Sequence, residues 1–153
     1  MGADIHVFLE YQSGENDWSC GDFFFLGEDS SLSTTPIYTA RNYALFDILH
    51  ECIPQNAVPK NMSTLVKNEI NRWTGSLYGL NHIMVSDLFK IWTEWEEKEV
   101  LDFPAGSSGL WYNNGYILAP FIQELMRNID FINYRAPYPI GLNSLRIVYF
   151  FDR

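Results

Sequence analysis

Apolar and polar side chains alternate along residues 4–11. Ile5, Val7 and Leu9 fall on one side of an extended chain, and Asp4, His6, Phe8 and Glu10 fall on the other. Alternation over this length is typical of a half-buried β-strand, so a strand is predicted at residues 5–11. A polar turn at 13–17 and an aromatic-rich segment at 18–26 follow. Together they predict a β-hairpin at the start of the fold.

Four later segments place apolar side chains three and four positions apart, which is the spacing of a helix with one buried face. Ser63 and Ser86 are the expected N-caps of the second and third helices. Pro54 ends the first helix, and Pro120 suits the first turn of the fourth. The predicted helices span residues 42–52, 64–73, 87–101 and 120–128.

The last strand is predicted at residues 145–151, a run of β-branched and aromatic side chains that indicates burial on both faces. A short first strand needs a partner, so both terminal strands are expected in one sheet. We therefore expect an α+β fold, a mainly antiparallel sheet that includes both terminal strands, with about four helices packed on it. Residues 1–153 are expected to form a single domain. Loops are expected at 30–36, at 102–115 and around Pro137 and Pro139.

Composition and charge narrow the classes of function. The chain has 153 residues, of which 47% are hydrophobic, enough for one core. Its net charge of −9 repels phosphate backbones, which disfavours general DNA or RNA binding. The sequence shows neither a signal peptide nor an apolar run of about 20 residues, so we expect a cytoplasmic protein without a membrane partner. Cys20 and Cys52 are expected to be reduced, buried thiols.

Three segments resemble an uncharacterised family of phage and bacterial proteins. They are Met-Gly-Ala-Asp-Ile-His at 1–6, Arg-Asn-Tyr-Ala-Leu-Phe at 41–46 and Arg-Ile-Val-Tyr-Phe-Phe-Asp at 146–152. Members of that family open with Met-Gly-Cys-Asp-Ile-His and end on a strand that closes in Phe-Asp. Ala3 stands where the family has Cys, and a His-Ser segment of the family is reduced around His82. The resemblance implies a phage setting, with the host cytoplasm as location, and names no reaction.

Asp4 and His6 lie two positions apart on the predicted first strand, so their side chains share one face. Such a pair can bind a divalent metal, and a zinc or manganese site needs one or two further ligands. His82, Asp152 or Glu10 can supply them if the terminal strands are neighbours. The alternative is a local hydrogen-bonded pair of a histidine and a carboxylate.

Arg41 and Arg146 are candidate ligand-binding residues in this acidic chain. A guanidinium binds a carboxylate or phosphate through paired hydrogen bonds, and Arg41 precedes a predicted helix whose free N–H groups attract anions. The alternative is a structural salt bridge from either arginine to Asp4 or Asp152. The aromatic side chains expected to stack on a base in a nucleotide pocket are Tyr43, Trp111 and Tyr112.

The third predicted helix carries the densest charge, with Glu94, Glu96 and Glu97 as candidate partner-binding residues. Such a run is either a solvated helix face or a docking surface for a basic partner. The sequence has no nucleophile elbow, phosphate loop or dinucleotide fingerprint. We therefore expect a phage-type accessory protein that acts by binding rather than catalysis.

The expected role of such a binding protein is counter-defence. It either blocks a host immune protein through the acidic surface or sequesters a small signalling nucleotide. One alternative is a metal-dependent hydrolase that uses Asp4, His6 and His82, and only this alternative requires a cofactor, the divalent metal. Another is a structural or assembly factor. The oligomeric state is left open.

Overall fold

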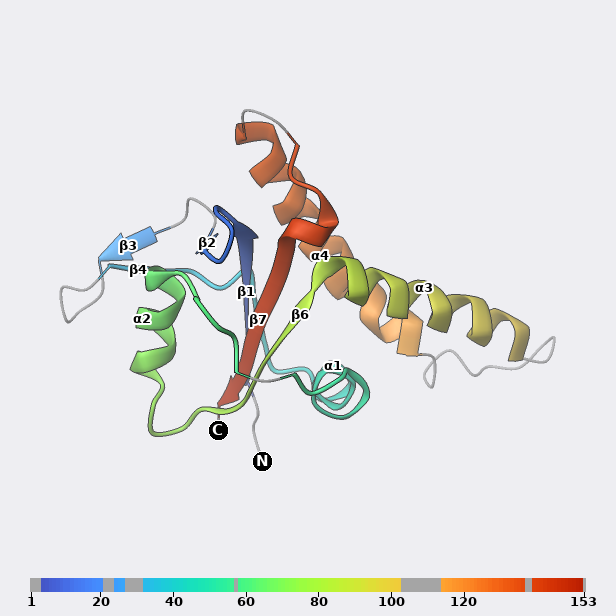
Figure 1. The fold of residues 1–153 in the computed structure, drawn as a ribbon. Helices are drawn as coiled ribbons and strands as arrows, with labels where there is room; N and C mark the ends of the chain where they lie inside the picture. Colours follow the sequence, from blue (N-terminus) through green and yellow to red (C-terminus); the bar gives the residue numbers. More distant parts are fainter. Residues whose placement is uncertain are drawn as a thin grey trace.

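The computed structural model of the chain describes residues 4–20, 24–26, 32–56, 58–102, 114–136 and 139–152 (Figure 1). The strands are β1 (Asp4–Gln12), β2 (Trp18–Cys20), β3 (Phe24–Leu26), β4 (Leu32–Thr34), β5 (Tyr38–Ala40), β6 (Tyr78–Met84) and β7 (Leu145–Asp152). The helices are α1 (Tyr43–Asp47), a π-helical turn (Ile48–Cys52), α2 (Thr64–Arg72), α3 (Val85–Asp102), α4 (Asn114–Arg135) and a 3-10 turn (Leu142–Ser144).

An antiparallel five-stranded sheet lies at the centre, in the order β2-β1-β7-β6, with β5 also paired to β1. The two terminal strands pair along their length, from Asp4 opposite Asp152 to Tyr11 opposite Leu145. This pairing confirms that both terminal strands share one sheet. Together with helices α1 to α4, it confirms the predicted α+β fold.

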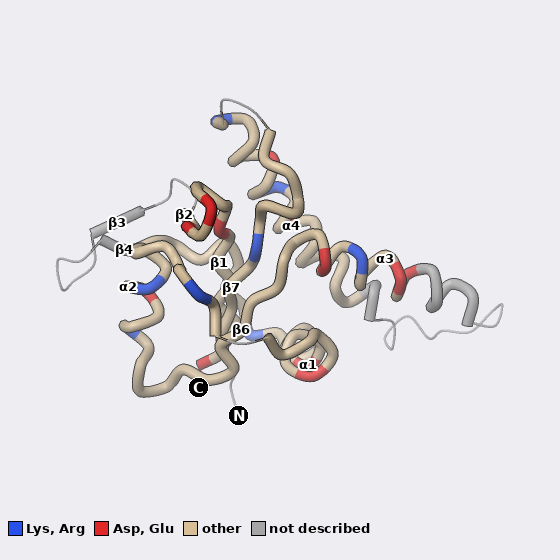
Figure 2. The backbone as a smooth tube through the Cα atoms, in the orientation of Figure 1, with Lys and Arg blue, Asp and Glu red and all other residues tan. Residues whose placement is uncertain are grey.

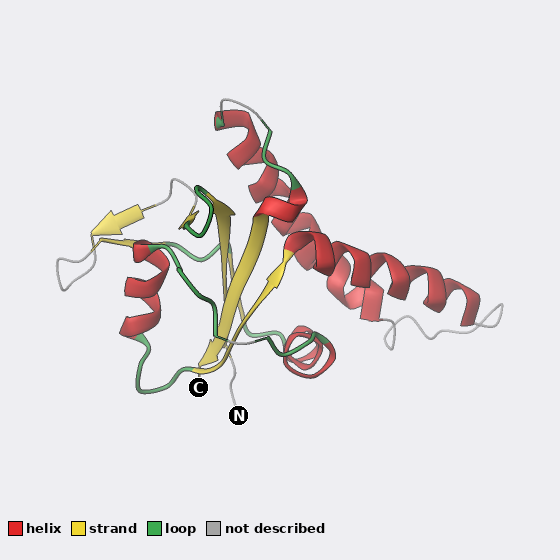
Figure 3. Cartoon of the chain, viewed as in Figure 1, coloured by secondary structure: helices red, strands yellow, loops and turns green. Residues whose placement is uncertain are grey.

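Helices cover both faces of this sheet. In Figures 1 and 3, α2 lies on one side of β1 and β7, while α1, α3 and α4 lie on the other. On the larger side, Ile5, Ile147 and Tyr149 pack in a core with residues of these three helices. On the α2 side, Phe8 and Phe150 belong to a smaller apolar cluster. Because both faces are covered, every residue of β7 is buried, as its apolar run predicted.

Side-chain caps begin two of the helices. Ser63 Oγ accepts a hydrogen bond from the Val66 N–H at the start of α2, which confirms the predicted N-cap. Asn42 Oδ1 accepts from the Leu45 N–H at the start of α1. The predicted first helix continues after α1 as a π-helical turn.

The strands of the structure differ from the predicted ones between β1 and β4 and at β6. The returning strand of the first hairpin ends at Cys20, and β3 pairs instead with β4, inside the segment predicted as a loop. β6 was not predicted, because Gly79 and Asn81 interrupt its apolar pattern. Gly79 has a left-handed φ of +67°, and the β6–β7 register shifts between Tyr78 and Asn81. This irregular strand is held by tertiary contacts that the pattern does not reveal.

Two predicted helix starts are also wrong. α3 begins at Val85, directly after β6, so Ser86 lies inside the helix rather than at its cap. α4 begins at Asn114 and contains Pro120 in its interior. The apolar stripe extends ahead of this proline through Leu118, which is fully buried, and burial of the longer stripe offsets the hydrogen bond that proline cannot make. Most of the expected loop at 102–115, and Pro137, lie outside the described residues.

Within the described ranges, no helix combines the length and apolar character that crossing a bilayer requires.

Candidate functional site

The polar side chains of β1 lie on the α2 side of the sheet, where each meets a partner. Asp4 pairs with Arg41, and His6 pairs with Asp152. Further along the same strand, Glu10 pairs with Arg146 of β7. The antiparallel register places Asp152 and Arg146 of β7 beside the polar residues of β1, whereas Arg41 follows β5, which pairs separately with β1. The three pairs differ in burial: the side chains of Asp4 and Arg41 are partly exposed, and those of the other two pairs are buried.

The Asp4–Arg41 pair is exposed. Arg41 Nε donates to Asp4 Oδ1 over 2.8 Å and Nη2 to Oδ2 over 3.3 Å, and the arginine side chain is 56% exposed. The hydrogen bond from Arg41 lowers the pKa of the Asp4 carboxyl. The predicted salt bridge from Arg41 to Asp4 is thus confirmed. Tyr43 is exposed beside it in sequence, while Trp111 and Tyr112 lie outside the described residues.

The His6–Asp152 pair is buried. His6 Nε2 donates to Asp152 Oδ2 over 2.8 Å, and the histidine ring has its centroid 4.8 Å from the rings of both Phe150 and Trp73. This is the hydrogen-bonded histidine–carboxylate pair that the sequence offered as the alternative to a metal ligand set, although the partner is Asp152 rather than Asp4.

The predicted metal site does not form. Asp4 is bound by Arg41, and His82 lies on β6, two strands or about 10 Å across the sheet from β1. Across the described parts of the chain, no three His, Cys, Asp or Glu side chains come together in a way that could hold a metal ion. The prediction that Asp4, His6 and His82 converge is therefore wrong, because the strand order separates the two histidines.

The Glu10–Arg146 pair is the most deeply buried of the three. The side chains are 0% and 4% exposed, and Arg146 Nε donates to Glu10 Oε1 over 2.8 Å. Glu10 Oε2 accepts from the Ser63 N–H (2.7 Å), so the carboxylate also holds the start of α2. Arg146 Nη2 donates to the Lys60 carbonyl (2.9 Å), and its guanidinium carbon lies 4.2 Å from the Trp18 ring centroid. The guanidinium is therefore held by a carboxylate, a backbone carbonyl and an aromatic ring.

A cleft of about 460 Å³ opens beside this guanidinium. The β1–β2 turn, the segment 56–61, β6 and β7 line it. Lys60 and Arg146 contribute positive charge, and Glu15 contributes one negative charge. Trp18 and His82 contribute aromatic rings. The remaining polar lining consists of side-chain amides, from Gln12, Asn16, Asn56 and Asn61.

Arg146 lines this cleft and retains hydrogen-bond donors that no described residue engages. A guanidinium has five N–H donors, of which Nε uses one on Glu10 and Nη2 one on the Lys60 carbonyl. Among the residues that the structure describes, Nη1 has no hydrogen-bond acceptor. A buried, immobilised arginine with unused donors at a cleft wall is suited to bind an anionic oxygen.

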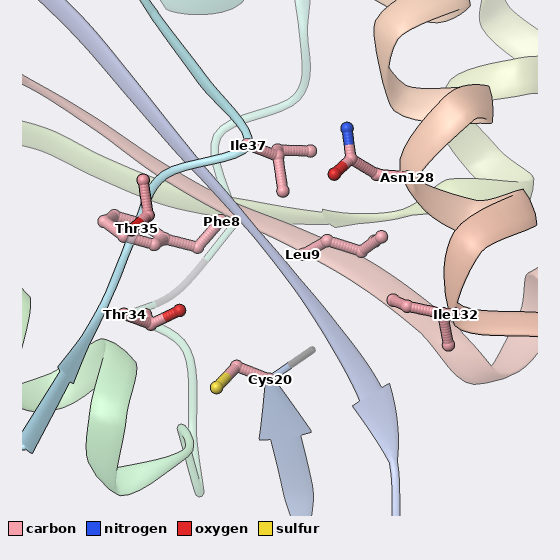
Figure 4. A pocket seen from close by; sticks show the side chains of 8 residues that line it. All are labelled: Phe8, Leu9, Cys20, Thr34, Thr35, Ile37, Asn128 and Ile132. Carbon is pink, nitrogen blue, oxygen red and sulfur yellow. The ribbon is translucent and has the colours of Figure 1, made fainter. Parts of the chain in front are cut away.

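A second cavity, shown in Figure 4, is too small for a ligand. Its volume is about 20 Å³, room for roughly one water molecule. Cys20 lies at its edge, and burial raises the pKa of this thiol. Partial desolvation raises the pKa of Cys52 too, with Glu51 and Asp47 adding to the effect. Both cysteines are free, as predicted, but Cys20 is only partly buried and Cys52 is exposed, so the predicted burial is wrong. A raised pKa suits neither thiol for nucleophilic attack.

The structure brings together only some of the predicted site residues. Arg146 and His82 line the same cleft, whereas Arg41 lies near Asp4, about 20 Å along β1 from Glu10. Glu94 and Glu96 are exposed on α3, and the side chain of Glu97 is not among those described.

Most of the cleft residues were missed because they lie on loops. The polar turn at 13–17 and the segment after Pro54 carry Asn16, Asn56 and Lys60. Loops carry binding residues more often than chance, but only the fold shows which loops meet.

Comparisons of the chain with protein-family models, with curated proteins and with solved structures give no match. The function must therefore be argued from the site.

Proposed function

We propose that the chain is a phage-type accessory protein that acts by binding, and that it sequesters a small signalling nucleotide in the cleft beside Arg146. The observation that carries the proposal is the buried Arg146 guanidinium, whose Nη1 donors are unused among the described residues at the cleft wall. The phage setting and the counter-defence role rest on the resemblance of the three sequence segments.

The cleft has the groups that a nucleotide requires. Arg146 Nη1 and the Lys60 ammonium provide charge-assisted hydrogen bonds for a phosphate. The amides of Asn16 and Asn56 both donate and accept, as the polar edge of a base or a ribose demands. Trp18 provides an aromatic surface for a base. The volume of about 460 Å³ lies within the range of about 300–1,000 Å³ that is usual for small-molecule sites.

The charge distribution favours a small ligand over a polymer. The net charge of −9 repels a nucleic-acid backbone that extends beyond the cleft. Inside the cleft, contacts to Lys60 and Arg146 act over a few ångströms, well within the screening length of about 8 Å at physiological salt. A single phosphate can therefore bind locally where a polyanion is excluded.

The proposal is tested by isothermal titration calorimetry with nucleoside monophosphates, cyclic mononucleotides and cyclic dinucleotides, each compared with its unphosphorylated nucleoside. Lys60→Glu is expected to weaken binding of the best ligand by about tenfold to a hundredfold, because it replaces a charge-assisted contact with a repulsion. Lys67→Glu, an equal charge change at an exposed position of α2, should leave the affinity within about twofold.

Arg41→Ala separates this cleft from the pocket that the sequence indicated. Because Arg41 lies about 20 Å from the cleft along β1, its removal should not change nucleotide affinity. The proposal is rejected if no nucleotide in the panel binds, if nucleosides bind as well as their phosphates, or if Lys60→Glu and Lys67→Glu weaken binding equally.

A further inference from the structure

We propose that a second groove, between residues 54–56 and helix α3, docks a partner-protein segment that carries two basic residues around apolar ones. The groove has a volume of about 310 Å³. Pro54, Ile83 and Ile91 give it an apolar lining, and Asp87, Lys90 and Glu94 supply its charged groups. The groove meets the nucleotide cleft at Asn56, which lines both, but its other lining residues differ and the inference does not depend on nucleotide binding.

One wall of the groove is held in place by hydrogen bonds to β6. The Asn56 N–H donates to Asn81 Oδ1 over 2.9 Å, and Asn56 Nδ2 donates to the His82 carbonyl over 2.6 Å. The buried Asn81 amide also donates to the Pro54 carbonyl over 3.0 Å. The segment 54–56 is therefore fixed against the outer edge of β6 before any partner arrives, which lowers the entropic cost of docking.

The other wall is the most acidic element of the chain. α3 contains six acidic residues and two lysines, a net charge of −4 out of −9 for the whole sequence. Positions 87, 91 and 94 recur at helical spacing, so Asp87, Ile91 and Glu94 share one helix face. In Figure 2 the described part of α3 shows acidic positions on either side of a basic one. This charge balance selects a cationic partner.

The positions of these charges specify the occupant more closely. Asp87 and Glu94 are seven residues apart, about 10 Å along the helix axis. Lys90 lies between them and repels a cation at the centre of the groove. The matching segment therefore places its two basic side chains about 10 Å apart, which about three residues of polyproline II conformation span with both side chains on one face. Apolar side chains between them face Ile83 and Ile91.

The test uses an acetylated and amidated hexapeptide, Ala-Arg-Leu-Leu-Arg-Ala, titrated into the isotopically labelled protein and followed by backbone amide chemical shifts. The peptide Ala-Glu-Leu-Leu-Glu-Ala is the charge-reversed control. Shift changes are expected at Gln55, Asn56 and residues 87–94 with the arginine peptide, and they should weaken as salt is added.

Two double variants separate docking from general charge attraction. Asp87→Asn combined with Glu94→Gln removes two groove charges and is expected to lower the affinity for the arginine peptide by about tenfold. Asp47→Asn with Asp130→Asn removes two exposed charges elsewhere and should change affinity less than about twofold.

Each outcome decides the inference. Equal losses in the two double variants, equal binding of the glutamate peptide, no binding, or shift changes away from the groove would overturn it. Lys60→Glu should leave peptide binding intact, so failure of the nucleotide proposal and failure of this one are distinguishable.

Discussion

The buried ion pair of Glu10 and Arg146 makes a stability prediction that can be worked from its contacts. Arg146→Met leaves the Glu10 carboxylate, 0% exposed, with the Ser63 N–H as its remaining hydrogen-bond donor among the described residues. Glu10→Leu leaves the guanidinium without its counter-ion and removes the acceptor of the Ser63 N–H. Removing one partner of a buried pair typically costs about 3–5 kcal/mol. Each single variant is therefore expected to lose a large part of the roughly 5–15 kcal/mol by which domains are stable.

Both substitutions together should cost much less than the sum of the two. The double variant removes both charges, so its remaining cost comes from the Ser63 N–H and Lys60 carbonyl, about 1–3 kcal/mol for each group left unsatisfied. The double variant is thus expected to lose about 3 kcal/mol or more less than the sum of the two single losses, and this difference is the coupling free energy between Glu10 and Arg146.

Urea unfolding of the four proteins, followed by circular dichroism, measures this cycle. With a slope of about 2 kcal/mol per molar urea, each single variant should shift the midpoint by about 2 M. Arg41→Met is the matched control, because it removes an arginine from the exposed pair with Asp4 and should shift the midpoint far less. Additive losses, or single losses no larger than that of the control, would refute the reasoning.

Two further predictions concern backbone space and acid titration. Gly79→Ala should lower the melting temperature markedly, because the added Cβ would lie 2.6 Å from the Phe151 ring and the backbone at this position is left-handed. Gly75→Ala is the control, since an added Cβ there would have no atom within 4 Å, and it should change the melting temperature little. Arg41→Met should raise the lowered pKa of Asp4 toward 3.8 in an NMR titration. In the native chain the lowered pKa stabilises the fold above pH 3.8, and this contribution is lost as the pH falls below it; the variant should lack the contribution. An unchanged Asp4 pKa would contradict this.

The sequence was sufficient to predict the two terminal strands because their patterns reflect burial directly. The alternation in β1 indicates a strand with one apolar and one polar face, and the apolar run in β7 indicates a strand that is covered on both faces. β6 could not be predicted in the same way. Its buried Asn81 is satisfied by Pro54, Asn56 and Tyr149, all distant in sequence, and these partners exist only once the chain has folded.

Two residues of the candidate site, Arg146 and His82, were singled out from the sequence, and His82 was predicted in a different role, as a metal ligand. Arg146 was singled out from the sequence, but Asp4 or Asp152 was named as its partner. The partner is set by the strand register, which places Glu10 opposite Arg146 when Asp4 is opposite Asp152. Register follows from the pairing of whole strands and not from any local signal. The remaining cleft residues, such as Lys60, come from loops whose meeting depends on the same pairing.

The energetics of the Glu10–Arg146 pair also bear on its role. A buried ion pair contributes little net stability, since well-packed apolar residues of similar volume are often equal or better. The exposed Asp4–Arg41 pair shows that β1 also holds an arginine that is not buried. At Arg146, which lines the cleft, the desolvated carboxylate fixes Nε and the Lys60 carbonyl fixes Nη2, while Nη1 has no acceptor among the described residues. An ion pair that adds little net stability yet immobilises a guanidinium at a cleft wall supports the proposed binding role of that cleft.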